Sequence, residues 1–401
     1  MAPWQRTALL LALASFVETL GFGHLGSFTP LYLQQLGVAP DALPTWTGVL
    51  SAASFVLGFP LAPLWGVWAD RYSRKLIIIR STLGEGVIFF LFSIAGEPWH
   101  LLAARMLVGF ILGNTGVMYA MLADLTPRRQ VAFAIGCISA GGTLGMSVGP
   151  FVGGWALGRI SLGQLYLIDA LACWAVVVLL AVLLRERRDR LRPHASTLDL
   201  LRALPRNVFA SPAVPPLFLL YFVVFFGANM QMPFVPLLVE AVYQGPDLPL
   251  AIGGVALAAG VLSAGSGPLL GRLAGRFGSR RVLTVALGVG ALAMLAQARA
   301  PDYGWLLVTR AAFGLVTGGA APLVVSMVAA AVPDDRRGSV LNIILFPSYF
   351  AWLFGPLLGS ALAAFGIRAA FAGSAVMVAA AAGLNAVLGR RAPEPERLSE
   401  D

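Results

Sequence analysis

Charged side chains that interrupt long apolar stretches are the residues of this chain most suited to chemistry. Glu18 lies about eleven residues into the first such stretch, roughly 16 Å along a helix, which is near the middle of a bilayer. An ionised carboxylate at that depth is strongly desolvated, so we expect Glu18 to bind and release a proton near neutral pH. Glu85 lies at a similar depth in the third stretch, either as a second proton-coupling acid or as a packed, protonated one.

Arg105 is a basic residue at membrane depth. Counting from Trp99 at the helical rise places it roughly 9 Å inside the fourth stretch. An unpaired guanidinium there is costly, so we interpret Arg105 as a proton-coupling residue that biases the titration of Glu18. The alternative is that its side chain extends to the outer headgroups. Arg310 repeats the position in the second half of the chain.

His24 and Asp169 are further titratable residues in apolar stretches. We expect His24 to pack its imidazole between helices, with a proton relay as the alternative. Asp169 lies near the outer end of the sixth stretch, so we predict an interfacial position for it.

The stretches that position these residues are long enough to cross a membrane. Of 401 residues, 58% are hydrophobic and 12% are charged, against roughly 25% charged in ordinary soluble domains. A helix needs about 20 apolar residues to cross the hydrocarbon core, and the sequence contains twelve such stretches. They are residues 8–36, 45–67, 76–96, 99–124, 131–157, 163–184, 215–241, 249–271, 281–299, 303–331, 338–364 and 367–389. We therefore predict an all-α membrane protein with 12 transmembrane helices.

The basic residues follow the membrane rather than a nucleic acid, although the formal net charge is +9. Loops after even-numbered stretches hold most of the arginines, whereas loops after odd-numbered stretches hold only Arg159, Arg299 and Arg368. By the positive-inside rule, the even-numbered loops and both termini are cytoplasmic, and no nucleic-acid partner is expected. Cys137 and Cys173 lack metal-ligand spacing, so we expect them to pack as small apolar residues without a disulfide or metal.

The two halves of the sequence repeat each other. Five landmarks recur at offsets of 205 or 206 residues. They are Pro30-Leu31 with Pro236-Leu237, Pro63 with Pro268, Gly66 with Gly271, Arg105 with Arg310, and Gly149-Pro150 with Gly355-Pro356. An offset that spans six helices preserves their orientation, so we predict two six-helix bundles related by a pseudo-two-fold axis along the membrane normal. The predicted domains are an N-terminal bundle (residues 1–184), a cytoplasmic linker (185–214), a C-terminal bundle (215–391) and a cytoplasmic tail (392–401).

The loop between the second and third stretches carries the most specific motif. It reads Gly66-Val-Trp-Ala-Asp70-Arg71-Tyr-Ser73-Arg74-Lys75. This motif is similar to Gly-x-Leu-Ala-Asp-Arg-x-Gly-Arg-Lys of the major facilitator superfamily, and the whole chain resembles the twelve-span drug/proton antiporter group of that family. Ser73 replaces a glycine of the pattern, which makes a positive-φ turn costlier at that position.

The resemblance implies a gate of charged side chains on the cytoplasmic side. The family residues that correspond to Asp70 and Arg74 lock this loop to neighbouring helix ends in the outward-facing state, and Asp124 occupies the place of an acid that takes part. The other gate residues of the motif are Gly66 and Arg71. Carboxylate and arginine form strong charge-assisted pairs at a partly buried interface. The alternative is that these charges only hold the loop in the cytoplasm.

A glycine-rich segment in the fifth stretch, residues 141–154, resembles the antiporter signature Gly-x-x-x-Gly-Pro-x-x-Gly-Gly of the same family. The matching residues are Gly145, Gly149, Pro150, Gly153 and Gly154. Glycines four residues apart let a neighbouring helix approach closely, and proline permits a bend. The family links this signature to export, and a plain packing role is the alternative.

The family fold also indicates which spans line a central cavity. The candidate cavity residues are Asn114, Tyr119, Asn229, Gln231, Asn342, Tyr349 and Trp352. Few fixed charges and many aromatic groups suit a lipophilic or cationic ligand. The sequence contains no nucleotide-binding loop and no catalytic or metal-ligand motif, so we expect no cofactor, no metal and no enzymatic activity.

These expectations combine into one predicted function. The chain is expected to be a monomeric transporter of the major facilitator fold in the lipid of a bacterial cytoplasmic (inner) membrane. It would export hydrophobic or cationic small molecules by alternating access, driven by the proton gradient. The alternative within transporters is a carrier for a specific metabolite, sugar or lipid. A more distant alternative is a non-transporting membrane receptor or a membrane-embedded enzyme.

Overall fold

The described part of the chain is built from helices and the loops that join them. The computed structural model describes residues 2–71, 73–111, 114–186, 212, 214–332, 340 and 346–391. Side chains are described over the same residues except 59, 60, 62–71, 390 and 391. The predicted tail and most of the predicted linker therefore lie outside the described residues.

The first half of the chain forms six crossings. Their bounds are α1 (Pro3–Gln35), α2 (Leu43–Arg71), α3 (Arg74–Ser93), α4 (Pro98–Leu107) with η1 (Val108–Phe110) and α5 (Asn114–Leu125), α6 (Val131–Leu157) after η2 (Arg128–Gln130), and α7 (Leu162–Leu183). The fourth crossing changes to a 3-10 turn at η1, where Gly109 packs against the backbone of α2. A Cβ on Gly109 would lie 2.5 Å from the Gly58 backbone nitrogen, so only glycine permits this approach.

The second half repeats the arrangement. Its elements are α9 (Val214–Gln231), η3 (Met232–Phe234), α10 (Val235–Val242), α11 (Leu248–Phe277), α12 (Ser279–Ala298), α13 (Tyr303–Ala330), α15 (Phe346–Ala363) and α16 (Ile367–Arg391). The seventh crossing is divided at η3, where Pro233 and Pro236 follow closely on one another. Proline has no backbone N–H, so two prolines three residues apart interrupt the helical hydrogen bonds there.

The two halves pack their helices in the same pattern. In the first bundle α1 packs on α6 and α3 on α7, and in the second α9 packs on α15 and α12 on α16. These pairs correspond to one another under the sequence offset. Contacts between the bundles obey the same symmetry, because α6 contacts α11 and α2 contacts α15. The predicted parallel repeat about a pseudo-two-fold axis is confirmed.

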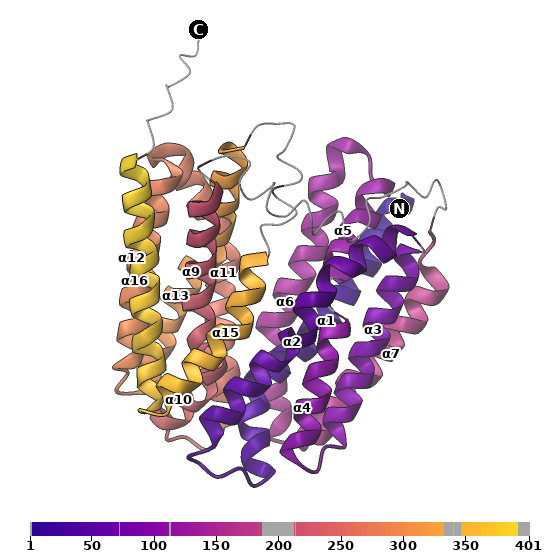
Figure 1. Ribbon diagram of the computed structural model, residues 1–401. Helices are drawn as coiled ribbons and strands as arrows, with labels where there is room; N and C mark the ends of the chain where they lie inside the picture. The colour runs from indigo at the N-terminus through magenta and orange to yellow at the C-terminus, as the bar shows by residue number, and fades with distance from the viewer. Residues whose placement is uncertain are drawn as a thin grey trace.

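The bundles meet at one end of the molecule and diverge toward the end that holds the N-terminus (Figure 1). At the end where they meet, Gln34 of α1 donates to both carboxylate oxygens of Glu240 of α10, at 3.1 and 2.9 Å. These residues are 206 positions apart, which equals the repeat offset, so they meet on the pseudo-two-fold axis. The backbones also touch, since a Cβ on Gly253 of α11 would lie 2.3 Å from the Pro150 carbonyl oxygen of α6.

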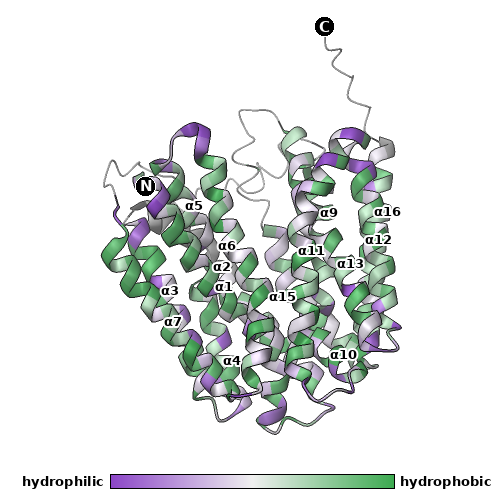
Figure 2. Ribbon diagram, turned by 180° about the vertical axis from the view of Figure 1, so that it is seen from behind, coloured by the Kyte–Doolittle hydropathy of each residue, from purple (hydrophilic) through white to green (hydrophobic). Residues whose placement is uncertain are grey.

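Hydrophobic residues cover the helices between two ends where hydrophilic residues gather (Figure 2). Ten helical segments of the described residues are long and apolar enough to cross a membrane, and Leu43–Gly58 of α2 forms a shorter apolar segment. Helix α15 provides the remaining crossing, and the first part of its predicted stretch, 338–364, is largely outside the described residues. The prediction of a helical membrane protein with twelve crossings is confirmed.

Candidate functional site

Glu18 of α1 is buried among three helices of the first bundle. Thr82 Oγ1 of α3 donates to Glu18 Oε1 at 2.6 Å, and Asn114 Nδ2 of α5 lies 3.0 Å from both Glu18 carboxylate oxygens. All of these partners are neutral, and over the described side chains Glu18 forms no ion pair. A carboxyl group with neutral partners can exist as the acid or as the anion, which is what proton exchange requires.

Glu85 of α3 is an electrostatic neighbour of Glu18 in the same interior. Its side chain is buried, and Glu85 Oε2 has no hydrogen-bond partner among the described residues. Two neighbouring carboxyl groups in a desolvated interior cannot both be ionised at low cost. Glu85 therefore fits a protonated acid, so that Glu18 and Glu85 together carry at most one negative charge.

Arg105 of α4 is buried, but it lies away from Glu18. Arg105 Nη2 donates to the Leu25 carbonyl oxygen at 3.1 Å and to Thr29 Oγ1 at 3.2 Å. Leu25 is about two turns beyond Glu18 on α1, roughly 10 Å along the helix axis. No direct contact supports the expected effect of Arg105 on the titration of Glu18, because the guanidinium joins α4 to a later part of α1. Burial also removes the alternative of a side chain that reaches the headgroups.

Arg310 repeats this arrangement in the second bundle with amide partners. Arg310 Nη1 donates to Gln231 Oε1 at 2.8 Å and to Gln297 Oε1 at 3.5 Å. Gln231, which the sequence analysis assigned to the cavity, is fully buried in this contact. This placement is a correction, because an amide that satisfies a buried guanidinium is not presented to a ligand.

An aromatic cluster joins the two bundles where α2 meets α15. The Trp352 ring of α15 lies 5.1 Å from Phe55 of α2, 6.2 Å from Phe225 of α9 and 5.7 Å from Tyr349, measured between ring centroids. Tyr221 extends the cluster at 4.6 Å from Phe225. Rings packed edge to face present both faces and edges, which can bind flat apolar or cationic groups. We call these five residues the aromatic cluster.

The sequence analysis named Tyr349 and Trp352 of this cluster and missed the other three rings. An aromatic residue in an apolar helix carries no signal that separates it from ordinary packing, and only the meeting of α2, α9 and α15 distinguishes these. Of the other cavity candidates, Tyr119 Oη lies 2.8 Å from Ser139 Oγ, and Asn229 donates to a carbonyl oxygen of its own helix at 2.8 Å. Asn342 lies outside the described residues.

The loop after α2 ends in a capped helix start. Ser73 has an extended φ of −173° and its Oγ accepts a hydrogen bond from the Leu76 backbone N–H at 3.1 Å, so Ser73 caps α3. The expected cost of a positive φ therefore does not arise. Glu186, which follows α7, accepts from the Arg74 backbone N–H at 2.7 Å and from the Ser73 hydroxyl. A carboxylate at a helix N-terminus is favourable, and the sequence analysis missed Glu186 because it lies far along the chain.

The structure brings Arg74 and Asp124 together. Arg74 Nη1 donates to Asp124 Oδ2 at 2.6 Å and to the Ala120 carbonyl oxygen at 3.1 Å. Both partners belong to the first bundle, on α3 and α5, so this contact does not by itself join the two bundles. The side chains of Asp70 and Arg71, with Gly66, lie outside the described side chains.

We expect the Arg74–Asp124 pair to contribute about 0.2–1 kcal/mol to stability, because Asp124 is 70% exposed and Arg74 23%. A double-mutant cycle of Arg74→Ala and Asp124→Ala in chemical unfolding measures this coupling. The exposed Arg128, paired with Asp124→Ala in a second cycle, is the matched control and should give no coupling. Equal coupling in the two cycles would contradict the pairing.

The glycine signature of α6 forms a contact face. A Cβ on Gly145 would lie 2.2 Å from the Phe16 carbonyl oxygen, and a Cβ on Gly149 would lie 2.6 Å from that of Leu20, both in α1. At the far end of the signature, a Cβ on Gly154 would lie 2.3 Å from a carbonyl oxygen of α11. The signature thus packs α6 on α1, while α11 of the other bundle approaches the same segment from Ser147 to Gly154.

Asp169 of α7 is buried, so the predicted interfacial position is wrong. Asp169 Oδ2 lies 2.8 Å from His24 Nδ1, and His24 Nε2 lies 2.9 Å from the Gly149 carbonyl oxygen. His24 is packed between helices as expected. Counting residues gave the depth of Asp169 but not the face of α7 on which it lies.

The fold and the buried acid define a class of protein, a polytopic membrane transporter made of two parallel six-helix bundles. The family model of the Major Facilitator Superfamily matches residues 11–296 and 217–401. The chain belongs to the Major Facilitator Superfamily and is a transporter, not an enzyme. The two matches overlap across the middle of the chain, as a repeated six-helix unit permits.

Curated relatives match almost the whole chain. The "Multidrug resistance protein MdtG" of Yersinia enterocolitica is 30% identical over 382 residues, covering 94% of this chain and 91% of the relative. The protein of the same name from Serratia proteamaculans is 30% identical over 410 residues, covering 99% and 97%.

Solved structures share the fold at low sequence identity. The nucleoside transporter NupG has a TM-score of 0.76 at 14% identity, covering 96% of this chain and 97% of its own. A bacterial homologue of the human lysosomal transporter Spinster, in an inward-facing and unoccupied conformation, has a TM-score of 0.76 at 18% identity, covering 97% of each chain. These structures establish the architecture alone.

Proposed function

We propose that this protein exports hydrophobic or cationic small molecules across a bacterial cytoplasmic membrane in exchange for protons. The observation that carries the proposal is Glu18, a buried carboxyl group with only neutral partners near the middle of the first bundle. The similarity to proteins named for multidrug resistance supports the substrate class. The exporter acts as a monomer, without a cofactor, and the proton gradient supplies the driving force.

Thr82 explains how Glu18 can change its protonation state without rearrangement. Thr82 Oγ1 lies 2.6 Å from Glu18 Oε1 and 3.1 Å from the Ile78 carbonyl oxygen. When Glu18 is ionised, the hydroxyl hydrogen points to the carboxylate. When Glu18 is protonated, its own hydrogen points to Thr82 Oγ1, and the hydroxyl hydrogen turns to Ile78. Both states keep every heavy atom in place.

The two-fold contact pattern supports alternating access. The bundles are closed where Gln34 meets Glu240 and apart at the end that holds the N-terminus. With both termini in the cytoplasm, as the positive-inside rule indicates, this conformation is open inward. Binding of a proton to Glu18 in one conformation and release in the other couples the two fluxes, because substrate and proton favour different states of one protein.

Transport of a panel of dyes by inverted vesicles tests the proposal. An imposed pH gradient should drive accumulation of lipophilic cationic dyes, and an uncoupler should abolish it. Equal dye movement with and without the gradient would remove proton exchange. Selective movement of one metabolite, sugar or lipid would instead identify a dedicated carrier.

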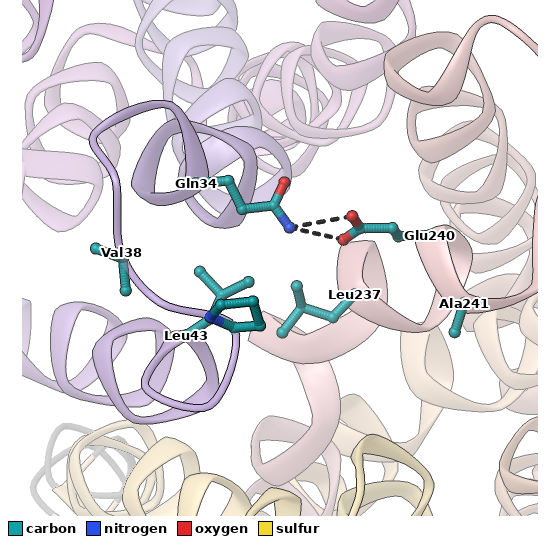
Figure 3. A pocket seen from close by; sticks show the side chains of 7 residues that line it. Gln34, Val38, Leu43, Leu237, Glu240 and Ala241 are labelled. Carbon is teal, nitrogen blue, oxygen red and sulfur yellow. Dashed lines mark hydrogen bonds between the residues drawn. The ribbon is translucent and has the colours of Figure 1, made fainter.

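A covalent link between positions 34 and 240 should stop transport. Figure 3 shows Gln34 and Glu240 pointing toward each other beside a pocket of about 600 Å³, with Leu43 and Leu237 also lining it. In a background lacking the two native cysteines, we expect Gln34→Cys and Glu240→Cys to react together with one short bis-methanethiosulfonate, which joins the two thiols through disulfides and releases sulfinate, and to lose export until the link is reduced. The single-cysteine variants should keep activity after the same treatment. Full export by the linked protein would contradict opening at this end.

Trp352 should contribute to the affinity for aromatic cations. Removing its ring in Trp352→Ala is expected to weaken dye binding about 2- to 30-fold, which corresponds to the ~0.5–2 kcal/mol of a cation–π contact. Trp352→Phe should retain most of the affinity. Phe354 lies on the same helix, is 49% exposed and stacks on Phe350, so Phe354→Ala is the matched control. Equal losses for Trp352→Ala and Phe354→Ala, measured by fluorescence titration, would count against the aromatic cluster as the binding site.

A further inference from the structure

The contact of His24 with Asp169 and Gly149 joins three helices of the first bundle. His24 comes from α1, Asp169 from α7 and Gly149 from α6. His24 is 2% exposed and Asp169 4%, so water does not compete for either side chain. Both ring nitrogens of His24 are used, Nδ1 at 2.8 Å from Asp169 Oδ2 and Nε2 at 2.9 Å from the Gly149 carbonyl oxygen.

The chemistry of these partners fixes the hydrogens. A carbonyl oxygen only accepts, so Nε2 of His24 must carry a hydrogen. A second hydrogen must lie between His24 Nδ1 and Asp169 Oδ2, because two lone pairs at 2.8 Å repel each other. We assign this proton to Nδ1, because imidazole is a stronger base than a carboxylate. The pair is an imidazolium beside a carboxylate, and its net charge is zero.

Losing that proton changes the packing of the helices. The deprotonated pair would carry a buried negative charge, and one ring nitrogen of His24 would turn a lone pair toward an acceptor, either the Asp169 carboxylate or the Gly149 carbonyl oxygen, which is costly in a desolvated interior. The imidazole would then have to turn or separate from α7 or from α6. It has little freedom to turn in place, because the ring fills the space of the missing side chain of Gly153, where a Cβ would lie 2.5 Å from His24 Cδ2. Deprotonation therefore favours separation of α1 from α7 and α6.

Several other titratable groups lie in the interior around His24 and Asp169. Asp169 has Tyr166 and Cys173 as electrostatic neighbours on its own helix. Those in the same interior on other elements are Tyr32 and Glu18 of α1, Glu85 of α3 and Arg105 of α4. Arg105 donates to Leu25 and Thr29 and not to Asp169. Helix α6 contributes no charged residue.

We propose that His24 and Asp169 are a second proton-binding site, which holds one proton in this conformation and fastens α1 to α6 and α7 until the proton leaves. The released proton passes from the His24 ring to water once the helices separate. Helix α6 also packs on α11 of the other bundle, so the site can sense the relative position of the two bundles. Its use in transport rests on the proposed proton exchange, whereas its protonation does not.

Nitrogen-15 NMR of histidine-labelled, full-length protein tests the protonation directly. The chain has 3 histidines, and His24→Gln identifies the signals of His24 by their loss. We expect both ring nitrogens of His24 to stay protonated from pH 5 to pH 8. Asp169→Asn should leave His24 neutral at pH 7. A wild-type His24 that is already neutral at pH 7 would overturn the site.

The accumulation of substrate in vesicles at the point where net flux stops tests whether the His24–Asp169 site is used in transport. The logarithm of the substrate accumulation ratio rises with the pH difference by a slope equal to the number of protons exchanged. We expect the slope of His24→Gln to be lower than that of the wild type by one, and that of His100→Gln to be unchanged. An unchanged slope for His24→Gln overturns the transport role. A slope of zero in the wild type would instead refute the proposed proton exchange, with the NMR result still deciding the protonation.

Discussion

Replacing Glu18 with glutamine is expected to abolish proton-driven accumulation of substrate while leaving the protein folded. Glutamine has nearly the shape of glutamate but no proton to exchange near neutral pH. The loss should exceed 100-fold in the initial rate of uphill transport, on the order of 3 kcal/mol or more, because the exchange step itself is removed. Downhill exchange of labelled for unlabelled substrate should persist, because it needs the moving bundles but no net proton flux.

The surroundings of Glu18 explain why the fold should survive. A glutamine amide in the place of Oε1 can donate to Thr82 Oγ1, which then donates to Ile78, and the carbonyl oxygen in the place of Oε2 can accept from Asn114 Nδ2. No buried polar atom loses its partner, so the thermal midpoint of Glu18→Gln should lie within a few degrees of the wild type.

Two variants separate the loss of the proton from the loss of a hydrogen bond. Thr82→Val removes the hydroxyl that serves both protonation states but keeps the carboxyl group, so uphill transport should fall and remain coupled to the pH gradient. Glu85→Gln changes the neighbouring acid, which fits a protonated carboxyl group, and should retain coupling. Full uphill transport by Glu18→Gln would exclude Glu18 from the mechanism.

Much of the architecture was predictable because a bilayer imposes it. Each crossing requires a long apolar stretch, and the repeated landmarks such as Arg105 and Arg310 fix the parallel relation of the halves. The same offset would have predicted the pairing of Gln34 with Glu240, since equivalent residues near a two-fold axis meet each other. That signal was present in the sequence and was not used.

The partners of the buried polar residues were not predictable in the same way. Depth follows from counting, but the face of a helix that is apolar all round does not, which is why Asp169 was placed at the interface. Arg105 was assigned to Glu18 for the same reason, since both residues lie at membrane depth. The residue of α1 that Arg105 contacts, Leu25, lies about two turns from Glu18. Thr82 and Phe55 carry no signal of function until helices distant in sequence are brought together.

Adding a single methyl group at Gly145 should damage the protein more than the same change elsewhere on α6. A Cβ at Gly145 would lie 2.2 Å from the Phe16 carbonyl oxygen and 2.9 Å from the Leu20 backbone nitrogen. Both atoms belong to the backbone of α1 and cannot turn aside as a side chain can. Helix α6 must move away from α1, at a cost of at least about 1–3 kcal/mol. We expect a lower thermal midpoint for Gly145→Ala and at least a tenfold loss of export.

Gly136 provides the matched control for this prediction. It lies on the same helix, is exposed, and a Cβ there would meet nothing within 4 Å. Gly136→Ala should therefore keep export and gain about 0.5–1 kcal/mol, since alanine restricts the unfolded chain and favours the helix. The displacement in Gly145→Ala also moves Gly149 relative to His24 of α1, so its export should fall further than its stability explains. Equal thermal midpoints and equal export for the two alanine variants would show that the glycine signature is not a contact face in the working protein.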